Sequence, residues 1–459
     1  MEKRVAELED RLRANSSNSS TAPSSNPLWA PKLKPKKPTG NKPGGQKGHQ
    51  GHHRQLLPVE QVDEVVDHLP QTCCHCRAPL DQQPPTLRSR HQVHELPTRA
   101  VVVTEHRSYA RTCASCGKGT TEPIPPAVRK SASGPRLSAA LCYLTAFVHG
   151  SRRAVEEVAG ELLGCRLSLG TVSNREAEMS EALESGYDQV RKRVRDAPAK
   201  NVDETGWRRA GRWLWVAATR TEALFRIDRG RNWHALQNLL GERVQGTVCS
   251  DRHGLYDRLK VECRAVCWAH LKRDFQRWVD RGGGAEGPPP SPASARVCLR
   301  LGGEGLSITK AVCGLFRRFK EARITRRGLS RLLAPLRRRM GALLDWGIGR
   351  GASAADAAAR KAARVSRFCR NLKDLGPALW TFARVEGIEP TNNHAERMLR
   401  PGVIWRKKCF GSHSEGGCRY AERMMTAVRT LRLNGRSVMQ YLSDTLHAHR
   451  HGNPLPSLA

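Results

Sequence analysis

Apolar residues recur at helical spacing in the part of the chain that begins near Arg136. Two sets follow one another, each on one face of a helix: Leu137, Leu141, Leu144 and Val148, then Ala154, Val155, Val158 and Leu162. A turn around Gly164 comes next, and Ser168 is suited to cap a further helix. We therefore expect a helical domain over residues 130–198.

Two helices, a short turn and a third helix are compatible with a helix-turn-helix, whose last helix enters the major groove of DNA. In that arrangement the residues that would meet DNA are Thr171, Ser173, Asn174 and Arg175. An ordinary helical hairpin fits the same pattern equally well.

From Lys200 the pattern changes to that of strands. We expect strands at residues 201–207, 212–218 and 223–227, a helix at 233–240, a strand at 246–250, a helix around Tyr256 and a strand at 264–269. This is the element order of a ribonuclease-H-like sheet. Asp203 would lie on the first strand and Asp251 at the end of the fourth, and these two strands can lie side by side. Residues 199–281 would form the first part of a catalytic core.

A Gly- and Pro-rich break at 282–292 precedes a region, residues 296–382, that is mostly helical in pattern and rich in arginine. Its arginines include Arg317, Arg318, Arg326, Arg327, Arg337, Arg338 and Arg339. Each charge taken singly fits a solvated face, but their number favours contact with a phosphate backbone. We assign residues 282–386 to a linker and an Arg-rich helical insertion.

A short helix is expected from residue 390 to 400, ended by Pro401. Within it, Glu396 and Arg400 stand four residues apart, which by spacing alone favours an ordinary surface ion pair. Residues 387–445 would complete the core, and residues 446–459 would form a C-terminal tail.

The first 58 residues contain little that could form a core. Val5, Leu8 and Leu12 could seed a short coiled coil, or simply a frayed helix, over residues 1–14. A tract rich in Ser, Asn, Pro and Lys follows, so residues 15–58 should be a disordered basic linker. Its glycine-rich end carries Lys47 and Arg54, which could contact phosphates, although a solvated tail is as good an interpretation.

Two CxxC motifs, 73–76 and 113–116, are separated by a strand-like stretch at 99–109. Such knuckles hold a tetrahedral zinc ion in zinc ribbons, so we expect a zinc-binding domain over 59–125. Its ligands would be Cys73, Cys76, Cys113 and Cys116, although Cys74 or His75 could replace one of the first pair. A zinc ion with four protein ligands is closed to catalysis, so it would support the fold or position nucleic acid. Unpaired structural cysteines are the alternative.

Composition points to a polyanionic partner. The chain of 459 residues has 78 Lys and Arg against 43 Asp and Glu, a formal charge of +35. Nucleic acid is favoured over a membrane, because the longest largely apolar stretch, residues 137–148, is shorter than the roughly 18–20 residues that a span requires. Without a signal-peptide core the protein is expected in the cytoplasm, with its cysteines reduced.

Several motifs, taken in order, resemble the transposases of the insertion sequence 66 type, the large DDE subunit of those bacterial elements. They are Asn15 to Ser20, Gly44 to His53, the paired CxxC knuckles, Val202 to Thr205, Ser250-Asp251 with Tyr256, Cys267 to His270, Asn392 to Arg397, Gly411 to Gly417 and Leu433 to Gly435. The resemblance covers nearly the whole chain. It implies a multidomain α+β protein with a zinc-binding domain, a ribonuclease-H-like fold, and Asp203, Asp251 and Glu396 as the metal-binding triad.

The expected activity is DNA strand cleavage and strand transfer at the ends of an insertion element. Asp203 would bridge two Mg²⁺ or Mn²⁺ ions about 3.5–4 Å apart, with Asp251 completing one site and Glu396 the other. Glu204 should point to the opposite face of its strand. Residues expected to orient the scissile phosphate or the target are His270, Asn393, Arg397, Arg400 and Lys407. For His270, a core imidazole is the alternative.

The expected partners are double-stranded DNA, both element ends and target, further copies of the chain on DNA, and accessory proteins of the same element. The expected location is the cytoplasm of a bacterium, at the nucleoid. Two other functions fit parts of the pattern: a DNA-binding regulator without catalysis, and a ribonuclease-H-like nuclease that cuts but does not join.

Overall fold

The structure is a computed structural model that describes residues 56–80, 84, 86–97, 100–116, 118–129, 131–207, 211–283, 292–350 and 357–458. The chain divides into two compact units: Pro31–Val102, and Met1–Ala30 together with Val103–Ala459. Each unit is described by itself. The helix expected at 1–14, most of the linker expected at 15–58, and Lys47 and Arg54 lie outside the described residues.

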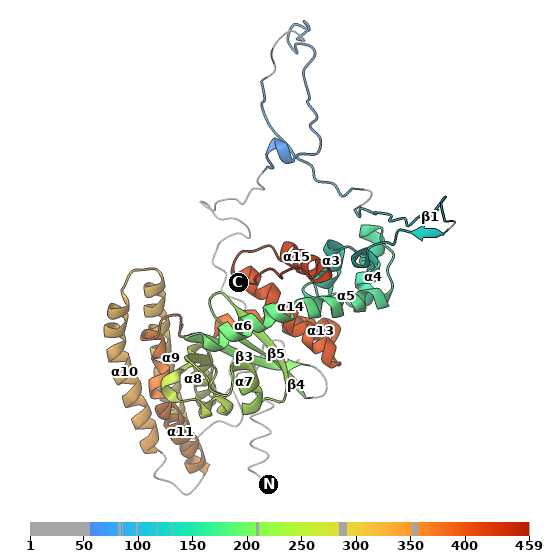
Figure 1. Ribbon diagram of the computed structural model, residues 1–459. Helices are drawn as coiled ribbons and strands as arrows, with labels where there is room; N and C mark the ends of the chain where they lie inside the picture. Colours follow the sequence, from blue (N-terminus) through green and yellow to red (C-terminus); the bar gives the residue numbers. More distant parts are fainter. Residues whose placement is uncertain are drawn as a thin grey trace. The chain divides into compact units, whose positions relative to one another are not determined.

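A five-stranded sheet forms the centre of the larger unit (Figure 1). Its strands are β3 (Ala199–Trp207), β4 (Arg212–Ala218), β5 (Ala223–Arg229), β6 (Thr247–Ser250) and β7 (Arg264–Val266). The order across the sheet is β5-β4-β3-β6-β7, with the first three antiparallel and β6 and β7 parallel to β3. All five strands expected between residues 201 and 269 are present.

Two of the expected element boundaries are wrong. The strand expected at 264–269 ends at Val266, because Trp268 already begins α8 (Trp268–Gly282). The helix expected around Tyr256 is the short 3-10 helix η3 (Gly254–Arg258), followed by η4 (Val261–Cys263). The helix expected at 233–240 is α7 (Trp233–Leu240), and its bounds are confirmed.

Strand β5 lies at an edge of the sheet, and side chains of α14 (Glu415–Leu433) satisfy its outward amides. The amides of Ala223, Phe225 and Ile227 donate to Thr430 Oγ1 at 3.2 Å, Thr426 Oγ1 at 3.0 Å and Glu422 Oε1 at 2.7 Å. These three acceptors are four residues apart, so they share one face of α14. The edge is thereby covered, and it cannot pair with another strand.

Helix α13 (Asn393–Cys409) packs on β3 and β4 and continues through Pro401, so the expected end at residue 400 is wrong. Proline removes one backbone hydrogen bond from a helix interior. Here Pro401, Gly402 and Trp405 are buried, and this packing outweighs the loss. Gly402 permits the close approach, because a Cβ there would lie 2.2 Å from Leu214 Cδ2.

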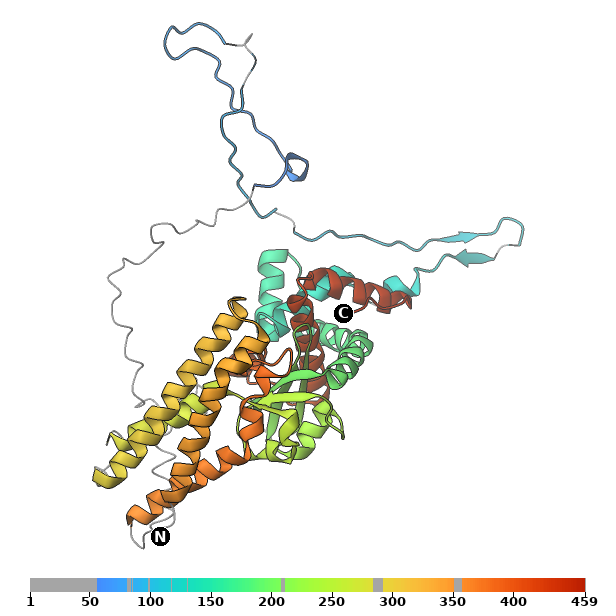
Figure 2. The ribbon, with the colours of Figure 1, turned by 90° about the vertical axis from the view of Figure 1, so that its left-hand side faces the viewer.

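The helices expected before the sheet are confirmed as α3 (Pro135–Ala146), α4 (Arg152–Leu163) and α5 (Leu169–Ala182), followed by α6 (Glu184–Asp196). Ser168 Oγ accepts from the Thr171 amide, as expected for a cap. The last helix, α15 (Val438–His451), packs against α3 and α5 (Figure 2). The tail expected at 446–459 therefore begins inside a helix, and Leu446 and Leu458 are buried.

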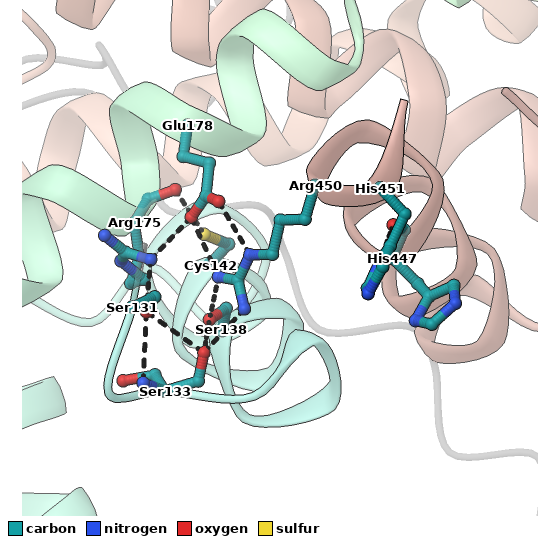
Figure 3. Close-up of polar contacts among 9 residues, drawn as sticks. All are labelled: Ser131, Ser133, Ser138, Cys142, Arg175, Glu178, His447, Arg450 and His451. Carbon is teal, nitrogen blue, oxygen red and sulfur yellow. Dashed lines mark hydrogen bonds and ion pairs between the residues drawn. The ribbon is translucent and has the colours of Figure 1, made fainter. Parts of the chain in front are cut away.

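A buried polar network fastens α15 to this helical layer (Figure 3). The Arg450 guanidinium binds both oxygens of Glu178, at 2.7 and 2.9 Å, and also the Ser133 carbonyl at 2.6 Å and Ser138 Oγ at 3.0 Å. Arg175 binds the same carboxylate at 2.6 Å. Burial alone would raise the pKa of Glu178, but the two arginines lower it below its ordinary value. The Glu178 carboxylate is thus bound by two guanidinium groups.

The region expected to be helical between residues 296 and 382 is confirmed. It forms α9 (Pro292–Lys320), α10 (Arg326–Gly349), α11 (Ala357–Asp374), α12 (Gly376–Leu379) and the 3-10 helix η6 (Thr381–Ala383). The three long helices lie together beside the sheet (Figure 1) and enclose a hydrophobic core of their own with α8. Gly305 of α9 lies against Phe275, where a Cβ would come within 2.2 Å of the ring.

The strand expected at 99–109 is wrong over its described residues. Residues 100–109 belong to no ladder, and β1 (Ala110–Thr112) begins after them and pairs with β2 (Gly119–Thr121). Val102 is 92% exposed, so this β-forming stretch has no core to pack on. The remaining short elements are η2 (Val59–Gln61) and α2 (Pro126–Arg129).

In the described part of the chain, every helix is too short or too polar to cross a membrane.

Candidate functional site

Asp203 and Asp251 come together through the register of two parallel strands. Asn201 of β3 pairs with Cys249 of β6. Asp203 and Asp251 each follow two residues later, so they lie at the same level and on the same face of the sheet. The charge of Asp251 is among the causes that raise the pKa of Asp203.

Glu396 reaches the same place through Asn392, the residue that precedes α13. The fully buried Asn392 side chain accepts from Asn201 Nδ2 at 2.9 Å and donates to the Val202 carbonyl at 2.7 Å. These bonds fasten the start of α13 to β3. Glu396 lies in the first turn of the helix, where the helix dipole favours a negative charge.

The carboxylates make this a strongly negative site. Burial raises the pKa of Asp203 well above its ordinary value, and the charges of Glu204, Asp251 and Glu396 raise it further. Asp203 accepts one backbone hydrogen bond, from the Glu204 amide at 3.0 Å. Glu396 Oε1 is buried and has no hydrogen-bond partner among the described residues. Such a surplus of carboxylate oxygens suits a divalent cation with a preference for oxygen ligands.

One arginine counters part of this charge. Arg231, in the segment after β5, binds Glu204 Oε1 at 2.6 Å and Asp251 Oδ2 at 3.3 Å. Glu204 also accepts from the Tyr256 hydroxyl at 2.5 Å, and its side chain is only 1% exposed. Asp251 is held further by the His253 amide, which donates to Oδ1 at 2.9 Å. Glu204 therefore holds Arg231 in a position where it also binds Asp251.

Another group of ligand-type side chains adjoins Glu396. Cys267, His270 and Glu396 offer ligand atoms that all lie within 4.8 Å of one another. Cys267 is fully buried and caps α8, and burial raises the pKa of its thiol to about 11. Burial also lowers the pKa of His270, as does the charge of Arg273, so its imidazole is favoured in the neutral form. His270 is 11% exposed, which leaves it little room to contact DNA.

The other residues expected to meet DNA on α13 share one face. Asn393, Arg397, Arg400 and Lys407 are all exposed and are spaced by three or four residues, or by seven. No ion pair joins Glu396 to Arg400, although both residues are described, so the surface pair suggested by their spacing is wrong. Arg406, on the side toward the sheet, instead binds Thr205 Oγ1 at 2.8 Å.

The residues expected to meet DNA on α5 divide into two kinds. Asn174 is exposed and Thr171 is partly exposed near the start of the helix. Arg175 is instead 13% exposed and binds Ser131 Oγ at 2.5 Å as well as Glu178 (Figure 3). These contacts give Arg175 a structural role within the helical layer.

The two cysteine knuckles lie in different units, Cys73 and Cys76 in Pro31–Val102 and Cys113 and Cys116 in the other. The expected domain at 59–125 is divided between them. Within each knuckle the fold suits a thiolate: the backbone amide of Cys76 lowers the pKa of Cys73, and that of Cys116 lowers the pKa of Cys113. A shared zinc ion stays a prediction.

The arginines of the insertion fall into two groups, exposed and partly buried. Five of those expected to contact DNA are exposed: Arg317, Arg318, Arg327, Arg338 and Arg339. Arg326 and Arg337 are partly buried, and stack on Phe319 and Trp380 with the guanidinium 5.0 and 5.4 Å from the ring centroids. These two residues hold α10 in place.

Sequence analysis missed three residues of the site: Asn392, Arg231 and Cys267. Asn392 carried a usable signal, because asparagine is favoured just before a helix. Cys267 stands in the Cys267-to-His270 motif, but nothing in that motif assigned it a role. Arg231 carried no signal, because its partners Glu204 and Asp251 are distant in the sequence and the chain is rich in arginine.

Comparisons with known proteins give two family matches. One, to a family of unknown function (DUF6444), covers residues 1–55. No curated protein matches the chain. The second match is to the transposase IS66 family and covers residues 130–420, more than half of the chain and all three carboxylates of the site. The chain therefore belongs to the IS66 family of transposases.

Proposed function

We propose that this protein is a DDE transposase that cleaves DNA strands at the ends of an insertion element and joins them to a target. Family membership supports a transposase-type enzyme that binds DNA and uses a divalent metal. The finer proposal depends on one observation: strand register and the Asn392 bridge gather Asp203, Asp251 and Glu396 from three distant segments.

The sheet supports a ribonuclease-H-like core for this enzyme. Three antiparallel strands are followed by two parallel ones, and the order β5-β4-β3-β6-β7 puts β3 at the centre. The register puts the end of β6, which Asp251 follows, beside the middle of β3, which carries Asp203. The long insertion enters between β7 and α13, so it does not interrupt the sheet.

Asp203, Asp251 and Glu396 would hold Mg²⁺ or Mn²⁺. When bound, the ions would activate a water or a 3′-hydroxyl and stabilise the leaving oxygen. The chain prepares this site: Arg231 and the His253 amide orient Asp251, and Asn392 fixes the turn that carries Glu396. Glu204 is already bound to Arg231 and Tyr256, so we do not propose it as a ligand.

DNA would be held by surfaces around the site. The exposed face of α13, with Asn393, Arg397, Arg400 and Lys407, begins beside Glu396 and would contact the phosphates next to the scissile bond. We propose further DNA contacts for Thr171 and Asn174 of α5, for the exposed arginines of the insertion and for the two cysteine knuckles. We also propose that further copies of the chain, and accessory proteins of the element, assemble on that DNA.

The test is an incubation of the full chain with Mg²⁺ and a DNA fragment that carries terminal inverted repeats. Wild-type protein should cut and join the fragment, whereas Asp203→Asn, Asp251→Asn and Glu396→Gln should bind it and do neither. Cutting without joining would favour a nuclease, and binding that ignores Mg²⁺ would favour a regulator. Mg²⁺-dependent cleavage by Glu396→Gln would remove Glu396 from the triad.

A further inference from the structure

Glu396 faces two different sets of neighbours. On one side its charge raises the pKa of Asp203, a member of the carboxylate group. On another side its Oε1 atom lies 3.9 Å from His270 Nδ1. Both of these atoms are buried, and neither has a hydrogen-bond partner in the described part of the chain. Two facing polar atoms without partners are costly unless something binds between them.

Cys267 completes a triangle with these atoms, since all three ligand atoms lie within 4.8 Å of one another. In a tetrahedral zinc site, ligand atoms are about 3.3–3.6 Å apart, as follows from Zn–N and Zn–O distances of about 2.0 Å and Zn–S of about 2.3 Å. The 3.9 Å separation of His270 and Glu396 is within about 0.6 Å of that geometry. Side-chain rotation would have to bring these two ligands closer by that amount, and the Cys267 sulfur, which lies within 4.8 Å of both, would also have to approach.

We propose that Cys267, His270 and Glu396 form a cation site for a thiophilic divalent ion of the Zn²⁺ class. A thiolate and an imidazole select such an ion, whereas Mg²⁺ prefers oxygen ligands alone. The thiol proton passes to solvent when the ion binds. Three protein ligands leave a fourth position open to water.

Two local contacts would stabilise a metal-bound thiolate at Cys267, although burial alone raises the pKa of the free thiol. Its sulfur accepts from the Asn392 amide at 3.1 Å, and its residue caps the N-terminus of α8, where the helix dipole favours negative charge. The same Asn392 places Glu396. One residue therefore orients two of the three ligands.

Glu396 is common to the proposed zinc site and to the carboxylate group around Asp203. One consequence depends on the proposed DDE function: an ion held by Cys267 and His270 would withdraw Glu396 from the Mg²⁺ site and inhibit strand cleavage. Zinc would then be a reversible inhibitor that competes with Mg²⁺ for one carboxylate.

The test counts zinc bound to the full chain after dialysis, so that any zinc at the N-terminal knuckles is common to all samples. Cys267→Ala should bind one equivalent fewer than wild type. Cys249→Ala is the matched control, because Cys249 is equally buried on the adjacent strand but is not a member of the ligand group, and it should bind as wild type does. Equal zinc in wild type and Cys267→Ala would overturn the proposal.

Cobalt supplies an independent spectroscopic signature. With Co²⁺ in place of zinc, the difference spectrum between wild type and Cys267→Ala should contain a thiolate-to-cobalt charge-transfer band. His270→Gln should weaken the affinity for this equivalent by at least about tenfold. If Cys267→Ala fails to fold, judged by circular dichroism, His270→Gln decides the question, and an unchanged affinity in that variant rejects the site.

The inhibition is measured separately. Zinc added to the cleavage reaction should inhibit wild type, and the concentration for half inhibition should rise at least about tenfold in Cys267→Ala. A chain that binds the extra equivalent but never cleaves would contradict the proposed function and leave the zinc site standing. Cleavage that zinc inhibits equally in both proteins would remove the competition for Glu396.

Discussion

Two buried charge clusters in this molecule are built in opposite ways. In the helical layer, Glu178 is bound by Arg450 and Arg175, and the pKa of Glu178 is lowered despite burial (Figure 3). In the middle of β3, Asp203 lies among three further carboxylates with one arginine nearby, and its pKa is raised. The first cluster is complete within the chain, whereas the second lacks positive charge.

The difference separates a structural role from a functional one. A paired buried charge stabilises the fold as long as both partners remain, and a group of like charges destabilises it unless a ligand neutralises them. The pH dependence also has opposite signs. The contribution of Glu178 is present above its ordinary pKa and lost on acidification, whereas that of Asp203 is present at low pH and lost as the pH rises through its folded-state pKa.

The largest effect is expected from Arg450→Ala. The substitution leaves Glu178 without its two-oxygen partner and strips the Ser133 carbonyl and Ser138 of a donor, so the free energy of unfolding should fall by about 3–5 kcal/mol. Urea unfolding of the two proteins measures this loss of free energy. The exposed Arg419 on α14 is the control, and Arg419→Ala should change stability by less than about 0.5 kcal/mol. Equal losses in the two variants would mean that the Arg450 network is not a structural clamp.

Glu422 tests an intermediate case, a buried carboxylate with a backbone donor but no ion pair among those of the described residues. Burial raises its pKa from 4.5 to about 7. The folded protein therefore holds the proton where the unfolded chain has lost it, and stability should decline between about pH 4.5 and 7 and then level off. Glu422→Gln keeps an acceptor for the Ile227 amide, so at pH 8 it should stabilise the fold, on the order of 2 kcal/mol.

The gain from Glu422→Gln should nearly vanish at pH 5, where the wild-type carboxyl is already protonated in the folded state. Thermal melts at the two pH values give the measurement. A variant that is less stable than wild type at pH 8 would show that the charge of Glu422 is balanced after all, as that of Glu178 is.

Local sequence patterns were sufficient to predict the strands of the central sheet and most of the helices. Strand-forming residues between clear turns predicted β3, β4 and β5, and the start of α5 followed from the capping preference of Ser168. The errors came where packing overrode a local rule. Pro401 did not end α13, because the surface that it buries on the sheet outweighs one lost hydrogen bond. The β-forming stretch before β1 pairs with no strand among the described residues. The residues after 445 continue α15, because the apolar side chain of Leu446 packs in the core.

The candidate site also has a part that local patterns predict and a part that depends on distant contacts. The placement of Asp203 and Asp251 on adjacent strands could be predicted from element order alone. Glu396 could not be placed that way, because its position depends on Asn392 reaching Asn201 across 191 residues of chain. Likewise, the pattern around α5 predicted a DNA contact for Arg175, but this side chain binds Glu178, which Arg450 also binds. Contacts between segments distant in the sequence decide which charged side chains have partners, and local sequence patterns do not predict such contacts.

A smaller stabilisation is expected from Asp203→Asn. With no divalent ion present, and above the raised pKa of Asp203, removing one of the crowded charges should raise the free energy of unfolding by about 1 kcal/mol, the repulsion of two charges about 4 Å apart in water. DNA cleavage should be lost in the same variant. Asp188→Asn on α6 is the control, because that carboxylate is half exposed and should contribute less than about 0.5 kcal/mol. If Asp203→Asn destabilised the protein, the contrast between the two clusters would be wrong.

The smallest effect is the stabilisation of the folded state by Mg²⁺. A ligand that binds only the folded state at a concentration equal to its Kd adds RT ln 2, about 0.4 kcal/mol. Wild type should gain this, measured as a rise in Tm against a monovalent salt of equal ionic strength. Arg450→Ala should gain the same amount from its lower starting point, since its cluster takes no ion, and Asp203→Asn should gain nothing. If instead Mg²⁺ stabilised Asp203→Asn as well as wild type, the surplus of negative charge around Asp203 would not be the cation site.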